Sequence, residues 1–161
     1  MASLRLPSRG AGFTLVELLA SAAIIGLLAM VAVPMVQTGV KRQKEHELRL
    51  ALRDIRQAID AYKLASAAGK IVLRPEDSGY PPSLGTLVEG VDDATRPGFR
   101  LRFLRRIPRD PFQPATLKPA ETWGKRSYES SAELPEEGVD LYDVYSKSPL
   151  TGLNSIAYRE W

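Results

Sequence analysis

The chain has 161 residues, 44% of them hydrophobic and 25% charged, a composition typical of one modest folded domain rather than a disordered chain. It has no cysteine, which excludes disulfides, iron–sulfur clusters and thiolate zinc sites. The formal net charge is +3, and it falls to +1 without residues 1–12, which hold two arginines and no acidic residue. A nearly neutral protein of this kind is not expected to bind nucleic acid through charge alone.

The first forty residues combine a short basic segment with a long apolar one. Residues 18–36 are all apolar or small, and only Ser21, Gly26 and Pro34 interrupt the run. A helix of this length spans about 28 Å, close to the ~30 Å hydrocarbon core of a bilayer. We therefore predict a membrane-spanning helix, which Pro34 should kink or locally melt because proline lacks a backbone donor.

Two general interpretations of this segment leave something unexplained. A secretory signal peptide would be cleaved after its apolar run, but this run is long and the charged Glu17 stands at its leading edge. A plain membrane anchor explains the length but not Glu17. A carboxylate deep in the apolar zone costs on the order of a few kcal/mol and usually marks a function.

A third interpretation follows from a resemblance. The residues Gly12-Phe13-Thr14-Leu15-Val16-Glu17 resemble the processing motif of type IV prepilins and type II secretion pseudopilins. The resemblance implies that a prepilin peptidase cuts between Gly12 and Phe13 on the cytoplasmic side and that Phe13 is then N-methylated. A proline also recurs in this family where Pro34 falls. This interpretation accounts for both the apolar helix and Glu17.

Cleavage would give Glu17 a partner. It creates a positive amino group on Phe13, and opposite charges attract strongly at low dielectric, where an unpaired charge is costly. We expect Glu17 of one subunit to pair with Phe13 of a neighbour and so to favour correct register during assembly. The other interpretation is that the carboxylate reaches the lipid headgroups.

The implied domain organisation has three parts. Residues 1–12 are a cleaved leader, residues 13–40 the transmembrane and assembly helix, and residues 41–161 a periplasmic globular domain. The resemblance places the chain in the bacterial inner membrane as a single-pass protein. The leader motif decides this orientation, because basic residues flank both ends of the apolar run and the positive-inside rule gives no clear answer.

The helix is expected to continue into the globular domain and to end near Ala68, with Gly69 as its C-terminal cap. Apolar residues recur there at steps of three and four, which predicts an amphipathic stripe packed on the protein's own sheet. The stripe consists of Leu48, Leu52, Ile55, Ile59 and Tyr62, and the other faces carry charges that include Glu45. His46, the only histidine, is expected to be solvated rather than a metal ligand.

Residues 74–98 are rich in proline, glycine and aspartate. They predict a loop and then a short helix from Ser83 to Val88. Six arginines then lie between Arg96 and Arg109. They form either a binding patch for acidic partners or nucleic acid, or a solvated rim. We favour the rim, interleaved with apolar contacts and with salt bridges between subunits. The apolar contacts are Phe99, Leu101, Phe103, Leu104 and Ile107.

The last forty residues predict short strands at 126–131, 141–146 and 155–158. Aromatic residues recur among them and are expected to form core, with an aromatic ligand site as the alternative. The predicted fold class is α+β. A long N-terminal helix, transmembrane in its first half, packs on a small C-terminal antiparallel sheet, as in pilins.

Later motifs refine the resemblance. Residues 80–84 (YPPSL), 107–112 (IPRDPF), 123–124 (WG) and 142–146 (YDVYS), with Trp161, resemble the major, G-type pseudopilins of type II secretion. Many of those bind calcium in the loop after the last of these motifs. Here residues 146–155 contain no carboxylate, so we predict no calcium site or only a weak one. A loop anchored by Leu150, Leu153 and Trp161 is expected to replace it.

The leading hypothesis is therefore a structural subunit of a periplasmic pseudopilus, not an enzyme, since no hydrolytic or redox constellation is present. The implied partners are prepilin peptidase, further copies of the chain, minor pseudopilins and an inner-membrane assembly platform. The second hypothesis is a type IV pilin or minor pilin for adhesion, motility or DNA uptake. The third is a membrane-anchored binding module that never polymerises.

Overall fold

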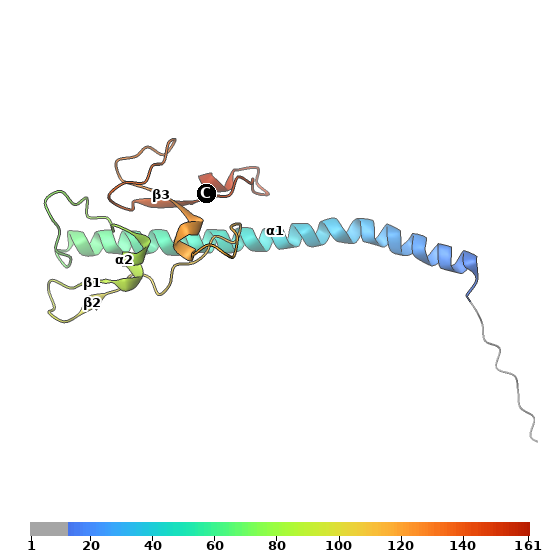
Figure 1. Ribbon diagram of the computed structural model, residues 1–161, viewed down its shortest axis with the longest axis horizontal. Helices are drawn as coiled ribbons and strands as arrows, with labels where there is room; N and C mark the ends of the chain where they lie inside the picture. The colour runs from blue at the N-terminus through green and yellow to red at the C-terminus, as the bar shows by residue number, and fades with distance from the viewer. Residues whose placement is uncertain (1–12) are drawn as a thin grey trace, which may run out of the picture. The chain divides into compact units, whose positions relative to one another are not determined.

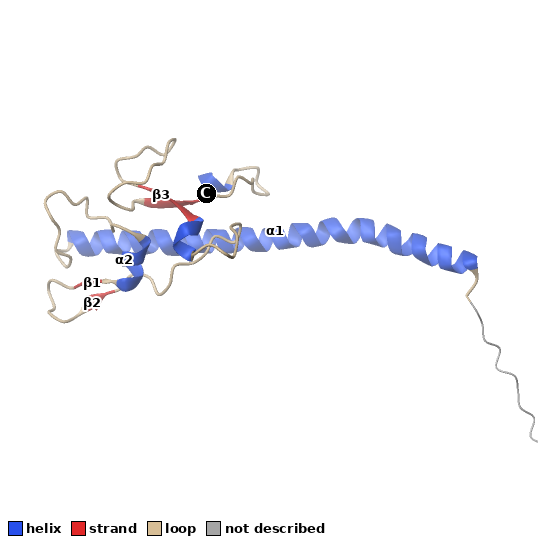
Figure 2. Cartoon of the chain, in the orientation of Figure 1, coloured by secondary structure: helices blue, strands red, loops and turns tan. Residues whose placement is uncertain are grey.

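The computed structural model describes residues 13–161, with residues 31, 33 and 34 described by their backbone alone. The fold is α+β, as predicted, and one long helix dominates it (Figures 1 and 2). The chain divides into two compact units, residues 1–40 and residues 41–161, and each is described separately. The elements in order are α1 (Leu15–Ala67), α2 (Leu84–Glu89), β1 (Val91–Asp92), β2 (Arg100–Leu101), η1 (Pro119–Thr122), β3 (Trp123–Arg126), β4 (Asp143–Ser146) and η2 (Tyr158–Glu160).

Within the first unit, the described residues form the N-terminal part of α1. The backbone is helical without interruption through position 34, so of the two expected effects of Pro34, a kink or local melting, the melting does not occur. Proline removes one hydrogen bond from the ladder, and the helix continues on both sides of it.

Within the second unit, the C-terminal part of α1 carries the predicted stripe. Leu48, Ile55 and Ile59 are at most 1% exposed, and Leu52 and Tyr62 are also buried. The helix ends within one residue of the predicted position. Gly69 has a φ of 69°, its N–H donates to the Ser66 carbonyl at 3.0 Å, and Lys70 donates to Ala65 at 3.0 Å. This is the Schellman arrangement that a left-handed glycine allows.

The short helix α2 begins as predicted. Ser83 is extended, and its hydroxyl accepts a hydrogen bond from the Thr86 N–H at 3.2 Å. Leu84 and Leu87 are buried. In Figure 1, β1 and β2 lie on one side of the second half of α1 and β3 lies on the other, and α2 overlaps α1 in this view. The apolar stripe of α1 therefore lies at the centre of the core of this unit.

The strands pair in two separate antiparallel hairpin-like sheets rather than one. β1 pairs with β2 through Val91 and Leu101, and β3 pairs with β4 from Trp123 opposite Ser146 to Arg126 opposite Asp143. Neither β1 nor β2 was predicted, because two residues give no alternating pattern.

Two of the predicted strands are wrong, and the third is too long. Only Arg126 of residues 126–131 lies in a strand, because the chain turns at residues 128–130. The strand predicted at 141–146 begins at Asp143. The segment 155–158 forms one bridge, between Thr151 and Ala157, and then enters η2.

The core joins the stripe of α1 to residues from the whole second unit. Trp123 and Tyr158 are fully buried, which confirms the prediction that these aromatics form core. The Trp123 indole N–H donates to the Pro108 carbonyl at 2.8 Å, so its polar end is satisfied. Tyr128 differs, since it is 59% exposed. Among the residues whose burial the structure describes, every buried hydrophobic one lies between Leu48 and Tyr158, and the second unit thus has a core of its own.

Candidate functional site

The start of α1 is fixed by Thr14. Its side-chain oxygen accepts a hydrogen bond from the Glu17 N–H at 3.2 Å, and its carbonyl accepts one from Leu18 at 3.1 Å. This is the position and geometry of an N-cap. The Ser21 hydroxyl donates to the Glu17 carbonyl at 2.8 Å. Glu17 consequently lies in the first turn, where the helix dipole stabilises a negative charge.

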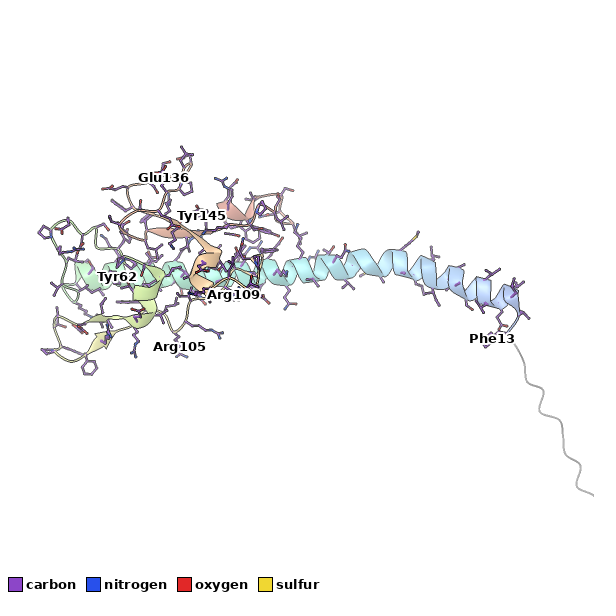
Figure 3. The ribbon with its side chains drawn as sticks, in the orientation of Figure 1. Phe13, Tyr62, Arg105, Arg109, Glu136 and Tyr145 are labelled. Atoms are coloured by element: carbon purple, nitrogen blue, oxygen red, sulfur yellow. The ribbon has the colours of Figure 1, made fainter. Side chains whose placement is uncertain are left out.

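The carboxylate of Glu17 is exposed, and it forms no ion pair with any residue that the structure describes. Phe13, immediately before the cap, is 79% exposed (Figure 3). Gly12 lies outside the described residues, and only the backbone of Pro34 is described. The pairing predicted between Glu17 and Phe13 joins two subunits and stays a prediction.

The apolar side chains of the first unit are also uncovered. Leu18, Ile25 and Leu28 are 63–66% exposed, and the other large apolar side chains described between Leu15 and Val36 are 60–78% exposed. Over the residues described, α1 is long and apolar enough in this part to cross a membrane. A run of this kind needs a bilayer or a bundle of other helices to remove it from water.

A second carboxylate of the same helix has the opposite environment. Glu45 is only 3% exposed. Its Oε1 accepts hydrogen bonds from the Leu153 N–H at 2.7 Å and the Tyr158 hydroxyl at 3.0 Å. Its Oε2 lies 3.8 Å from an Arg49 guanidinium nitrogen. Glu45 therefore holds the C-terminal loop against α1, and its assignment to the solvated face was wrong.

The sequence contains a signal for this role. Glu45 stands three residues before Leu48 and continues the three-and-four spacing of the buried stripe. A charged residue in register with a core stripe is buried only when it is paired. Its partners cannot be identified from local patterns, because both are more than 100 residues away.

Tyr158 is affected by this contact. Burial, followed by the hydrogen bond to Glu45 and its charge, raises the pKa of Tyr158 to about 12. The tyrosine hydroxyl therefore stays protonated and remains a donor to the carboxylate throughout the physiological range.

The loop at residues 146–155 is held by polar contacts and by one of the three expected apolar anchors. Trp161 packs against the core and lies beside Gly152 of the loop. Leu150 and Leu153 are 55% and 45% exposed, so the expectation was wrong for these two residues. The Ser146 hydroxyl instead donates to the buried Asp110 carboxylate at 2.5 Å, and the Ser148 N–H donates to Ser146 at 3.1 Å. Among the described residues, no group of three or more acidic or histidine side chains is placed to hold a metal ion. The prediction of an absent or weak calcium site stays a prediction.

Arg56 of α1 makes a second long-range connection, to strand β4 and to the C-terminal residue. Its Nε donates to Asp143 at 2.8 Å, and its Nη1 donates to the Trp161 backbone oxygen at 2.8 Å. Asp143 is also 3.6 Å from Arg126 on the paired strand. Strand β4 and the C-terminal residue are thereby fastened to the same helix turn.

The arginine run is mostly the solvated rim that was predicted. Leu101, Phe103, Leu104 and Ile107 are partly buried against the core, whereas Phe99 is 65% exposed, which corrects its assignment as an apolar contact. The arginines between positions 96 and 106 are exposed. Arg109 has a structural role instead, since it donates to the Leu117 and Pro114 carbonyls at 2.6 and 2.7 Å.

One comparison with known proteins bears on these observations. Residues 7–33 match the family model described as the prokaryotic N-terminal methylation motif. The match supports a type IV pilin-like prepilin signal, and it implies processing by prepilin peptidase and assembly into a filament. Subunits with this motif are structural proteins rather than enzymes. No curated protein and no solved structure matches the chain.

Proposed function

We propose that the chain is a structural subunit of the periplasmic pseudopilus of a type II secretion system, cut between Gly12 and Phe13 and N-methylated on Phe13. The observation that carries this proposal is the carboxylate of Glu17, which has no partner among the described residues and lies at the head of a helix whose apolar side chains are exposed. A single chain leaves the apolar surface exposed and offers Glu17 no partner among the described residues that would pair its charge in an apolar environment. A bundle of such helices, each bringing a new amino terminus, satisfies both.

The order of motifs in residues 80–146 supports the secretion pseudopilus over other pilin-like filaments. The secretion role, the periplasmic placement and the partners named above rest on this resemblance. Prepilin peptidase would act first, and minor pseudopilins and an inner-membrane platform would then organise assembly. Residues 13–40 would form the filament core, and residues 41–161 its outer layer.

Replacing Glu17 tests the proposal. Glu17→Ala should reduce assembled filament by about tenfold or more, because each neighbouring amino group then lacks its partner at low dielectric. Glu17→Gln should fail similarly, since it keeps the shape but not the charge. Both variants should still be inserted and cleaved, which the mass of the N-terminal peptide reports.

The matched control is Glu76→Ala, which removes an exposed carboxylate of the second unit whose ion pair with Arg74 is 3.7 Å long and solvated. It should leave assembly unchanged. Normal filament yield and normal secretion from the Glu17→Ala variant would contradict the register role.

The exposed arginines between positions 96 and 106 favour a second candidate, a surface type IV pilin or minor pilin. Such a protein would form filaments outside the cell. Salt-sensitive DNA binding by residues 41–161, lost when Arg102, Arg105 and Arg106 are replaced, would support the DNA-uptake form of this candidate. Neighbouring genes for a secretion ATPase and a secretin would support the pseudopilus instead.

A further inference from the structure

The basic segment of the second unit has charges without internal partners. Residues 96–109 contain six arginines and no acidic residue. Arg102, Arg105 and Arg106 are exposed and form no ion pair within the described part of the chain. Arg100 has a long, exposed pair with Asp92 at 3.8 Å. The free charges are therefore concentrated at and around Arg105 and Arg106.

These two arginines border a groove along α1. Two adjoining hollows, of 460 and 520 Å³, share Asp54, Arg106 and Pro108 as lining residues. The apolar part of the lining consists of Leu50, Ala51, Ala58, Phe103, Leu104 and Ile107. Asp54 and Glu47 also line the hollows and offset part of the positive charge, so the unpaired positive charge lies at the rim, at Arg105 and Arg106. The groove thus fits an apolar side chain flanked by carboxylates.

A segment with those properties exists in the same chain. Residues 127–140 contain five acidic residues and no basic one. Glu137 pairs with Lys125 at 3.2 Å, but Glu133 and Glu136 use their carboxylates in no ion pair or hydrogen bond among the described residues. Between them Leu134 is 75% exposed. Pro135 follows it and restricts the backbone, so the tip presents a leucine between two free carboxylates.

The two surfaces face different directions. Figure 3 shows Glu136 and Arg105 on opposite sides of α1. One molecule therefore cannot satisfy its own charges through these surfaces, and two like surfaces repel each other. Only a head-to-tail contact pairs the acidic tip of one copy with the basic groove of the next. Such a heterologous contact leaves a free surface at each end and propagates.

We propose that residues 133–136 of one copy dock in the groove at Arg105 and Arg106 of a second copy, with Leu134 on the apolar lining and the glutamates against the arginines. This contact rests on the proposed filament function and adds a specific link between globular units. Opposite charges across this contact would also disfavour wrong pairings, because two acidic tips or two basic grooves would repel each other.

Cysteine pairing in the full chain tests this contact, because the protein has no cysteine of its own. The doubly substituted chain, Glu136→Cys with Arg106→Cys, is assembled in its native host, and the filaments are mildly oxidised. A head-to-tail contact predicts a ladder of covalent oligomers from the double variant and only monomer from each single variant. Dimers from a single variant would overturn the proposal in favour of a symmetric contact.

Exchange of the charges across the contact is a second test of the proposal. Arg105→Glu with Arg106→Glu should lower filament yield at least tenfold, and adding Glu133→Arg with Glu136→Arg should restore it. The matched control, Arg96→Glu with Arg100→Glu, changes the net charge equally within the same basic segment but outside the groove, and should have little effect. Equal losses from the pair and its control, with no restoration, would overturn the proposal.

The proposed contact and the proposed filament function can be distinguished by experiment. Filaments that form normally but give no ladder would remove this contact and leave the filament function intact. A chain that is never found in filaments would remove the filament function, and this contact with it.

Discussion

Two carboxylates on one helix, Glu17 and Glu45, have opposite environments. Glu45 is buried and accepts two hydrogen bonds from the C-terminal segment, whereas Glu17 is exposed and has no partner in the described part of the chain. A buried charge that lacks a partner is costly, and an exposed one is not. Glu45 is therefore a fold-stabilising residue, whereas the pairing of Glu17 with a neighbouring subunit stays a prediction.

The hydrogen bond between Tyr158 and Glu45 predicts the effect of removing the tyrosine hydroxyl. Tyr158→Phe keeps the ring and removes the hydroxyl that donates to the buried carboxylate at 3.0 Å. We expect the free energy of unfolding to fall by about 1.5–3 kcal/mol. Urea unfolding of residues 41–161 measures it. Tyr128→Phe is the control, because that ring is 59% exposed, and an equal loss from both variants would contradict the role of Glu45.

The same hydroxyl predicts a loss of stability at alkaline pH. The pKa of Tyr158 is raised to about 12, above the value near 10 expected in the unfolded chain. Its contribution is fully present below pH ~10 and is lost as pH rises toward ~12, because the unfolded chain releases the proton first. The stability difference between the wild-type fragment and Tyr158→Phe should therefore shrink over this range. A difference that is constant between pH 10 and 12 would contradict this linkage.

Single residues also mark what the sequence can predict. Gly69 and Ser83 were correctly placed at helix ends, because capping depends on neighbours within a few positions. The partners of Glu45 and Arg56 could not be predicted, since each contact joins α1 to residues about 90 or more positions later. The candidate residues Gly12, Phe13 and Glu17 came from a local motif, which is the reason sequence alone could propose them.

At the scale of elements, α1 carries two apolar surfaces with different roles. The stripe from Leu48 to Tyr62 is buried in the second unit, while Leu18, Ile25 and Leu28 are exposed in the first. The spacing of the stripe predicts its burial, because helical period and core contact agree there. Burial of the first surface requires a membrane or neighbouring subunits.

The stripe predicts a sharp contrast between two positions of the helix. Ile55 is fully buried, and Ile55→Ala should lower the free energy of unfolding by about 2–5 kcal/mol through lost burial and a cavity. Leu64 is 71% exposed, and Leu64→Ala should change it by no more than about 0.5 kcal/mol. Denaturant unfolding of residues 41–161 compares them, and similar losses at both positions would contradict the assigned packing.

The strands were harder to predict than the helices. β3 begins at Trp123 and includes Gly124, a residue that weakens a strand signal. Its place is set by packing: the Tyr145 ring of the paired strand occupies the space where a side chain at position 124 would lie. The register between β3 and β4 thus depends on a cross-strand contact that no short pattern reveals.

At the scale of the whole molecule, the two units differ in whether their apolar side chains are buried within the unit. Residues 41–161 contain their own core and satisfy most of their buried polar groups. Residues 13–40 expose an apolar helix surface with one carboxylate in its first turn. The core of the second unit is formed by its own residues, whereas the apolar surface of the first unit needs a bilayer or other helices to remove it from water.

The most direct test of this account is the mass and N-terminal sequence of the full-length protein isolated from its native host. We predict a mature chain that begins at Phe13 and carries one methyl group on its amino nitrogen. A chain that still begins at Met1, or one that is cut after the apolar run beyond Val36, would contradict it.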